Sequence, residues 1–162
     1  MTGQLRDFLT IIAIFSLLAY GCEKIKSYPD EPEIEFSKFR YNDTTLVFSF
    51  VDGDGDFGLL QSDTTGPFHH DSAYYYNLFL DFYEKVDSAF EKMEFEIPTN
   101  YRIINLPEPQ GQNKTLRGDI EIELKGYGTF PDTFKLSFYI VDRSFHKSNM
   151  VLTPELSFLN EN

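Results

Sequence analysis

The stretch Thr45–Leu60, TLVFSFVDGDGDFGLL, decides the fold. Its first part, TLVFSFV, places Leu46, Phe48 and Phe50 at alternate positions. Because side chains alternate between the two faces of a β-strand, this spacing predicts a strand with one apolar face. The loop DGDGDFG follows directly, and its glycines permit the positive φ angles of a tight turn. A strand that ends in an acidic, glycine-rich loop is therefore the centre of the predicted fold.

The rest of the chain repeats this alternation in short segments separated by turn-forming residues. Four segments alternate in this way: 34–41, 73–86, 116–125 and 133–141. Residues 101–104 and 150–158 predict two shorter strands, and Pro154 makes the last one an edge strand or interrupts it. No segment after residue 33 has the 3.6-residue period of a helix. About 7–9 short antiparallel strands predict an all-β sandwich or barrel over residues 34–160, and we favour a two-sheet sandwich.

The segment 73–86 also predicts a hairpin. If Asp87-Ser88 is the turn, residues whose numbers sum to 175 lie opposite each other. The apolar pairs are then Leu78 with Ile97, Leu80 with Phe95, and Phe82 with Met93. The other face pairs Tyr83 with Lys92 and sets Asp81 against Glu94, a like-charge pair that indicates a solvated face or a shared cation.

The amino terminus predicts an exported protein. Residues 8–19 (FLTIIAIFSLLA) are shorter than the ~20 residues of a membrane-spanning helix. They match the ~7–15-residue apolar core of a secretory signal. The following Ala19-Tyr20-Gly21-Cys22 resembles the lipobox of bacterial lipoproteins, although leucine is usual where Ala19 stands. The resemblance implies a signal peptide over residues 1–21 and an acylated Cys22; the alternative is an ordinary signal peptide and a free thiol.

The composition limits what the mature chain does. Cys22 is the single cysteine, so an intrachain disulfide and a CxxC metal site are excluded. Residues 22–33 hold two prolines and predict a tether, and the remainder has the size of one domain. The formal charge of −12 argues against binding nucleic acid or anionic headgroups. Acyl chains on Cys22 would hold the protein on its membrane instead.

Three aspartates at every second position of the acidic loop predict a cation site. An EF-hand uses oxygen ligands at loop positions 1, 3, 5 and 12, with glycine at position 6. Asp52, Asp54 and Asp56 fill positions 1, 3 and 5, and Asp63 falls at position 12, but Phe57 replaces the glycine. The pattern leaves two alternatives, a calcium site made by these four aspartates or a solvated turn, and no other cofactor is predicted.

The remaining polar residues predict no catalytic site. The sequence has no G-x-S-x-G, no H-E-x-x-H and no phosphate-binding glycine loop. His69-His70-Asp71 supplies zinc-ligand types, but neighbours on an extended chain point in opposite directions, which favours a surface loop. We predict that His146 lies in a loop as well. These observations favour a protein that binds or assembles and is not an enzyme, with a hydrolase as the last alternative.

The aromatic residues serve a core, a ligand surface or both. The chain has 17 phenylalanines and 10 tyrosines but no tryptophan. The candidates for a platform on which sugar rings stack are Tyr74, Tyr75, Phe79 and Tyr83. The alternative is that these side chains only cover the two faces of a middle strand.

Two further stretches resemble known families. The ending YIVDRSFHKSN, followed by a strand, resembles the corner between the last two strands of bacterial immunoglobulin-like modules, which often reads D-R-A-G-N-x-S. Three residues match that pattern: Asp142, Arg143 and Ser148. VDGDGDFGLL (51–60) resembles a stretch that recurs in uncharacterised Bacteroidota-type lipoproteins. Together these resemblances imply a single immunoglobulin-like β-sandwich of that family.

The same resemblances imply a location and a general role. The protein is expected in the bacterial cell envelope, anchored by lipid at the outer membrane, on its periplasmic or its surface face. The expected role is a non-catalytic accessory module of an envelope protein complex. The alternative is a carbohydrate-binding surface lipoprotein whose partner is a glycan.

Overall fold

The computed structural model describes residues 3, 27–104, 106, 109–111, 113–125 and 130–160. Cys22 and, apart from Gly3, the expected signal peptide lie outside the described residues, and the expected tether is described from Ser27 onward. In this part of the chain no helix is both long and apolar enough to cross a membrane.

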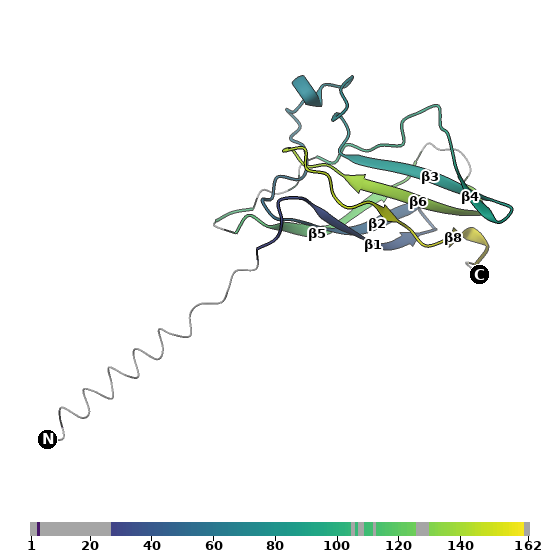
Figure 1. Ribbon diagram of the computed structural model, residues 1–162, viewed down its shortest axis with the longest axis horizontal. Coiled ribbons are helices and arrows are strands. Elements are labelled where there is room, and N and C mark those ends of the chain that lie inside the picture. The colour runs from purple at the N-terminus through teal and green to yellow at the C-terminus, as the bar shows by residue number, and fades with distance from the viewer. Residues whose placement is uncertain are drawn as a thin grey trace.

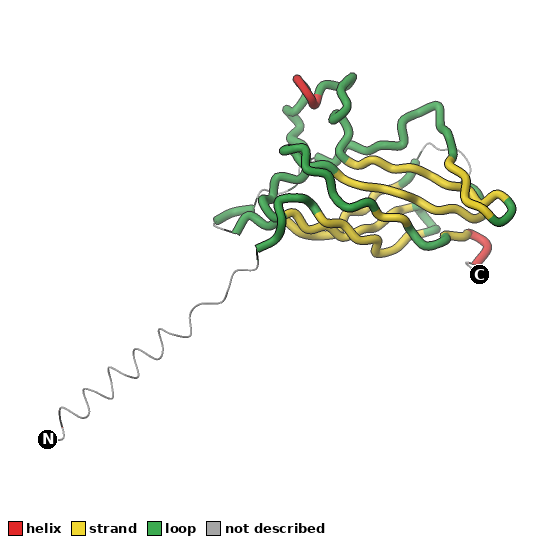
Figure 2. The backbone as a smooth tube through the Cα atoms, in the orientation of Figure 1, coloured by secondary structure: helices red, strands yellow, loops and turns green. Residues whose placement is uncertain are grey.

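Two antiparallel sheets lie face to face in the described part of the chain (Figure 1). The strands are β1 (Glu33–Arg40), β2 (Thr45–Asp52), β3 (Leu78–Val86), β4 (Ala89–Lys92), β5 (Leu116–Glu123), β6 (Thr133–Ile140), β7 (Val151–Leu152) and β8 (Leu156–Ser157). Loops and two 3-10 helices, η1 (Gly66–Phe68) and η2 (Phe158–Asn160), connect or follow them (Figure 2). The all-β prediction is confirmed.

The strand order is that of an immunoglobulin-like sandwich. In that fold strands A, B and E share one sheet, and strands C, F and G form the other, which C′ can extend. Here one sheet has the order β1-β2-β5 and the other β4-β3-β6-β7, with β8 also paired to β6. β7 and β8 are two short pieces on either side of Pro154, as the absence of an N–H donor in proline predicts.

The core forms where the apolar faces of the two sheets meet. Phe48 of β2 and Phe138 of β6 are both fully buried, and their ring centroids lie 5.1 Å apart. Towards the start of β6, Phe39, Phe134 and Phe158 form a second aromatic cluster, with Phe134 5.4 Å from Phe39 and 5.8 Å from Phe158. The alternation of β2 and β6 therefore predicts their buried faces correctly.

The β3–β4 hairpin follows the predicted register near its turn. The paired residues are Tyr83 with Lys92, Glu84 with Glu91, Lys85 with Phe90, and Val86 with Ala89. Beyond this point Asp81 binds Lys92, with 2.9 Å between Oδ1 and Nζ, and Asp81 and, more weakly, Glu94 raise the pKa of this lysine. This ion pair removes the like-charge cost that the extended register implies.

Farther from the turn the predicted register is wrong. Leu78 pairs with Tyr101 through two backbone hydrogen bonds of 3.0 and 2.8 Å, and not with Ile97, which is 48% exposed. Side chains occupy the intervening positions, since Thr99 Oγ1 donates to the Leu80 carbonyl and Asn100 Oδ1 accepts from its amide. These side chains replace backbone partners, and the chain between β4 and Tyr101 leaves the ladder.

Two alanine substitutions test this arrangement. Phe48→Ala empties a site between the sheets and is expected to lower the free energy of unfolding by about 3–5 kcal/mol. Ile97→Ala removes an exposed side chain and is expected to change it by less than about 0.5 kcal/mol. Urea denaturation of both variants measures the difference. A large loss of unfolding free energy in Ile97→Ala would instead support the predicted register, in which Ile97 faces Leu78.

Candidate functional site

Two places in the domain bring together side chains that could bind a ligand or an ion. The first, the acidic cluster, consists of Asp52, Asp54, Asp56 and Asp142. The second, the outer groove, is lined by Tyr83, Phe90, Lys135, Ser137, Met150 and Leu152 on the solvent-facing side of the β4-β3-β6-β7 sheet.

The acidic cluster joins the ends of two strands from different sheets. Asp52 is the last residue of β2, and Asp142 comes shortly after the end of β6. One carboxylate oxygen from each of the four aspartates lies within 4.8 Å of the others. The pairing of Phe48 with Phe138 holds β2 against β6 and thereby brings these strand ends together.

Glycines let the acidic loop fold tightly beside this cluster. A Cβ atom at Gly53 would lie 2.1 Å from the Pro29 carbonyl oxygen, so the tether segment packs directly on the loop backbone. Gly55 has a φ of 74°, and a Cβ there would lie 2.0 Å from the Lys114 carbonyl oxygen. Only glycine fits at either position.

Hydrogen bonds orient two of the loop carboxylates. Asp52 Oδ2 accepts from the Phe57 amide at 2.7 Å, and Asp56 Oδ2 accepts from Ser144 Oγ at 2.6 Å. The Oδ1 atoms of Asp52, Asp54 and Asp56 are buried and accept no hydrogen bond from the described residues. Within the described part of the chain, each of these two carboxylates therefore keeps one oxygen without a partner.

His146 orients the fourth carboxylate. Asp142 Oδ1 accepts from the His146 amide at 2.8 Å, and Asp142 Oδ2 lies 3.0 Å from His146 Nδ1. The nearby carboxylate of Asp142 raises the pKa of His146, while burial raises the pKa of Asp142 itself. Burial, with the neighbouring carboxylates adding to it, raises the pKa of Asp52 to about 7. The cluster resists full ionisation unless a positive charge compensates it.

The fourth aspartate of the acidic cluster is not the one that the EF-hand spacing predicts. Asp63 lies outside the acidic cluster, and its Oδ2 accepts from the Leu60 amide at 2.8 Å in a separate turn. Phe57 explains the departure, because its buried ring packs on Phe50 with 5.3 Å between centroids and draws the loop into the core. Asp142 takes the fourth place, which spacing alone does not predict.

A small cavity gives solvent access beside the acidic cluster. Its volume is about 230 Å³, and it is lined by Asp54, Gly55, Asp56, Pro109, Lys114 and Arg143. Arg143 Nε donates to the Asp56 carbonyl at 2.9 Å, and Lys114 Nζ donates to the Pro109 carbonyl at 3.4 Å. Both basic side chains thus help to hold the walls of this cavity.

The three exposed residues His69, His70 and Asp71 also lie together. The two imidazole rings are 4.0 Å apart between centroids, and Asp71 Oδ2 lies 3.0 Å from His70 Nε2. The prediction that the two rings point in opposite directions is wrong, because the backbone is extended at His69 but turns at His70 and Asp71. All three are exposed, so the surface location is confirmed.

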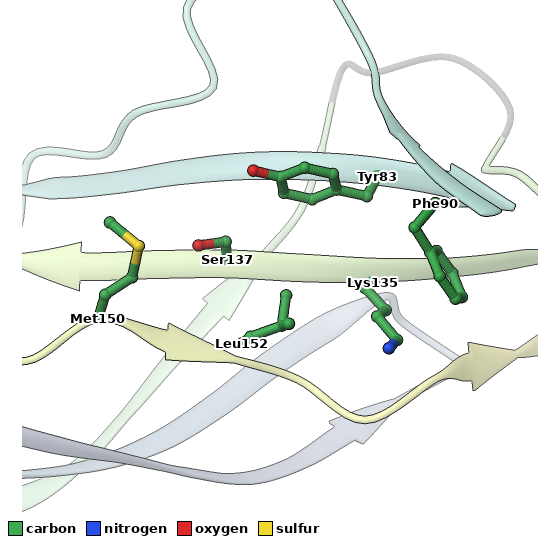
Figure 3. A pocket seen from close by; sticks show the side chains of 6 residues that line it. All are labelled: Tyr83, Phe90, Lys135, Ser137, Met150 and Leu152. Atoms are coloured by element: carbon green, nitrogen blue, oxygen red, sulfur yellow. The ribbon is translucent and has the colours of Figure 1, made fainter.

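The outer groove has a volume of about 520 Å³ and a largely apolar lining. Figure 3 shows Tyr83 and Phe90 on one side, and Met150 and Leu152 on the other, with Ser137 of β6 between them. An adjoining hollow of about 200 Å³ shares Ser137 and Met150 with it and adds Phe79, Leu80, Asp81, Asn100 and Tyr139. The two hollows form one depression with an apolar end and a more polar end.

Two of the four predicted platform residues line this depression, namely Phe79 and Tyr83. Tyr74 instead packs on Phe145, with 4.6 Å between ring centroids, and the ring of Tyr75 lies under Arg102. Met150 and Leu152 complete the outer groove, and the sequence reasoning missed them. No sequence pattern marks them, because β7 consists only of Val151 and Leu152, and Met150 precedes it.

Comparisons with models of known protein families, with curated protein sequences and with solved structures found no match for this chain.

The pKa of Asp52 predicts how the metal-free protein responds to pH. Between about pH 4 and pH 7 the folded protein holds a proton that the unfolded chain releases, so the free energy of unfolding falls as pH rises. The slope is at most about 1.4 kcal/mol per pH unit for one group. The raised pKa values of Asp142 and His146 act in the same direction.

Urea denaturation in EDTA across this range measures the slope. Asp52→Asn is expected to flatten it, whereas Asp119→Asn, which changes an exposed acid on β5, is expected to leave it unchanged. A wild-type stability that rises with pH relative to Asp52→Asn would contradict the prediction.

Proposed function

We propose that the protein is a lipid-anchored, non-catalytic binding module of the bacterial cell envelope, and that the outer groove binds a partner protein. The observation that carries the proposal is the apolar character of a surface where a solvated sheet face is normally polar. Met150 and Leu152, which both line this groove, are 60% and 59% exposed.

The shape and lining of the outer groove support a protein ligand. Its lining is apolar except for Lys135, Ser137 and the hydroxyl of Tyr83, and the buried centre of a protein interface is likewise rich in aromatic residues and Met. Met150 has a flexible side chain, a property that suits surfaces which adapt to a partner. Lys135 Nζ lies 4.4 Å from the centroid of the Phe90 ring, so a basic group stands at the end of the apolar lining.

A glycan is the second candidate, and the adjoining hollow favours it. Phe79 and Tyr139 stack there with 4.9 Å between ring centroids, and Lys147 Nζ lies 3.7 Å from the centroid of Tyr139. Asp81 and Asn100 line the same hollow and supply hydrogen-bonding groups next to the rings. Aromatic rings beside such groups are a suitable surface for a sugar.

The membrane anchor is a separate part of the proposal and rests on the sequence around Cys22. Cys22→Ser is expected to move the protein from the membrane fraction to the soluble fraction, because acyl chains supply the membrane affinity. Fractionation of the native host, together with the intact mass of the wild-type protein, measures this change. An unmodified thiol on wild-type protein would contradict the anchor while leaving the groove proposal standing.

A matched pair of substitutions tests the outer groove. Leu152→Glu places a charge in the groove, and Leu159→Glu places the same charge on a similarly exposed leucine, 65% exposed, in η2. Burying the new carboxylate in an interface is costly, so Leu152→Glu is expected to reduce recovery of the partner about tenfold or more. Affinity purification of the full chain from cross-linked native envelopes measures that recovery.

The control defines the outcomes. Equal recovery with Leu152→Glu and Leu159→Glu would contradict the groove as the protein-binding surface. A glycan-array signal that Phe79→Ala abolishes and Tyr75→Ala preserves would replace the protein partner with a glycan, since Phe79 lines the adjoining hollow and Tyr75 lines neither hollow.

A further inference from the structure

We propose that the acidic cluster is a calcium site whose ligands come from both sheets, with Asp52, Asp54 and Asp56 on the β2 side and Asp142 on the β6 side. This inference is independent of what the outer groove binds. The bound ion would fasten the end of β2 to the end of β6.

The unpartnered oxygen of Asp52 provides the evidence beyond the clustering of acids. Asp52 is fully buried at 0% exposure, its Oδ2 is satisfied by the Phe57 amide, and its Oδ1 has no partner among the described residues. A buried carboxylate oxygen without a donor is costly, and native proteins rarely leave one unpaired. Asp54 Oδ1 and Asp56 Oδ1 are also buried atoms without a partner among the described residues, although these two residues are only half-buried. A cation would give all three oxygens a partner at once.

The surrounding bonds prepare these carboxylates for an ion. Ser144 holds Asp56, and His146 holds Asp142 through two contacts. Bonds of this kind orient ligands around a metal and reduce the reorganisation that binding requires. Asp54 lines the small cavity beside the cluster, which gives the ion a path from solvent.

The donor set favours calcium over other common cations. All four ligands offer carboxylate oxygens, which suit hard cations and not the sulfur- and nitrogen-rich sites that zinc prefers. Ca²⁺ binds oxygens at about 2.3–2.6 Å, so ligands on opposite sides of the ion lie about 4.6–5.2 Å apart. The separation of up to 4.8 Å within the cluster allows one ion to touch all four acids. Mg²⁺ needs shorter bonds and retains its waters.

Calcium titration of the EDTA-stripped full chain, purified in detergent, tests the site. Isothermal titration calorimetry is expected to give one Ca²⁺ per chain. At a hundredfold excess over the dissociation constant, the melting temperature is expected to rise by about 10 °C. The same concentration of Mg²⁺ is expected to raise it less.

Conservative variants distinguish this site, in which Asp142 is the fourth ligand, from an EF-hand-like site, in which Asp63 would be. Asp54→Asn and Asp142→Asn are each expected to abolish most of the calcium-induced rise, whereas Asp63→Asn is expected to keep it, because Asp63 only caps a turn. The wild-type protein failing to respond to calcium would overturn the proposal. A response that survives in both Asp54→Asn and Asp142→Asn, or that is lost only in Asp63→Asn, would also overturn it. If Asp142→Asn does not fold, Asp54→Asn against Asp63→Asn decides.

Discussion

The packing of Phe48 on Phe138 is the contact on which the rest of the structure depends. It joins β2 of one sheet to β6 of the other, and it buries both rings completely. The same contact aligns the two strands across the core, and Asp52 and Asp142 lie together although 90 positions separate them in the sequence. An apolar contact in the core thus places like-charged side chains close together at the end of the sandwich. Four carboxylates are held together where protons or a cation must compensate their charge.

The two candidate sites occupy different parts of the sandwich and differ in how closely they are tied to its stability. The acidic cluster lies at the end where the tether segment packs on Gly53, close to the point where the chain enters the domain. The outer groove lies on the solvent-facing side of β3 and β6 and depends on side chains that leave the core unaffected. A substitution in the groove is therefore expected to have little effect on folding. A substitution in the acidic cluster changes the stability of the end of the domain that faces the tether.

The sequence predicts the local structure well, but it predicts poorly the contacts between residues that are far apart in the sequence. The alternation in residues 45–51 and 133–141 identifies the buried faces of β2 and β6. Side chains two residues apart share a face of a strand, so the apolar set can lie only on the face that turns toward the core. The hairpin register holds only while backbone groups pair with each other. It is lost where Thr99 and Asn100 bind the backbone with their side chains. Asp142 is missed because loop spacing describes one segment, whereas this site combines two strand ends. Tyr83 is the one residue of the outer groove that the sequence predicts, since β7, which holds Leu152 and follows Met150, is too short to show a period.

Hydrogen–deuterium exchange of the full chain with and without Ca²⁺ tests the central claim most directly. A site that both sheets share predicts that residues 52–58 and 141–146 gain protection together and at the same calcium concentration, while residues 61–65 do not change. Protection confined to 52–65, with no change at 141–146, would show a local loop site. That result would contradict the joining of the two strand ends by one ion.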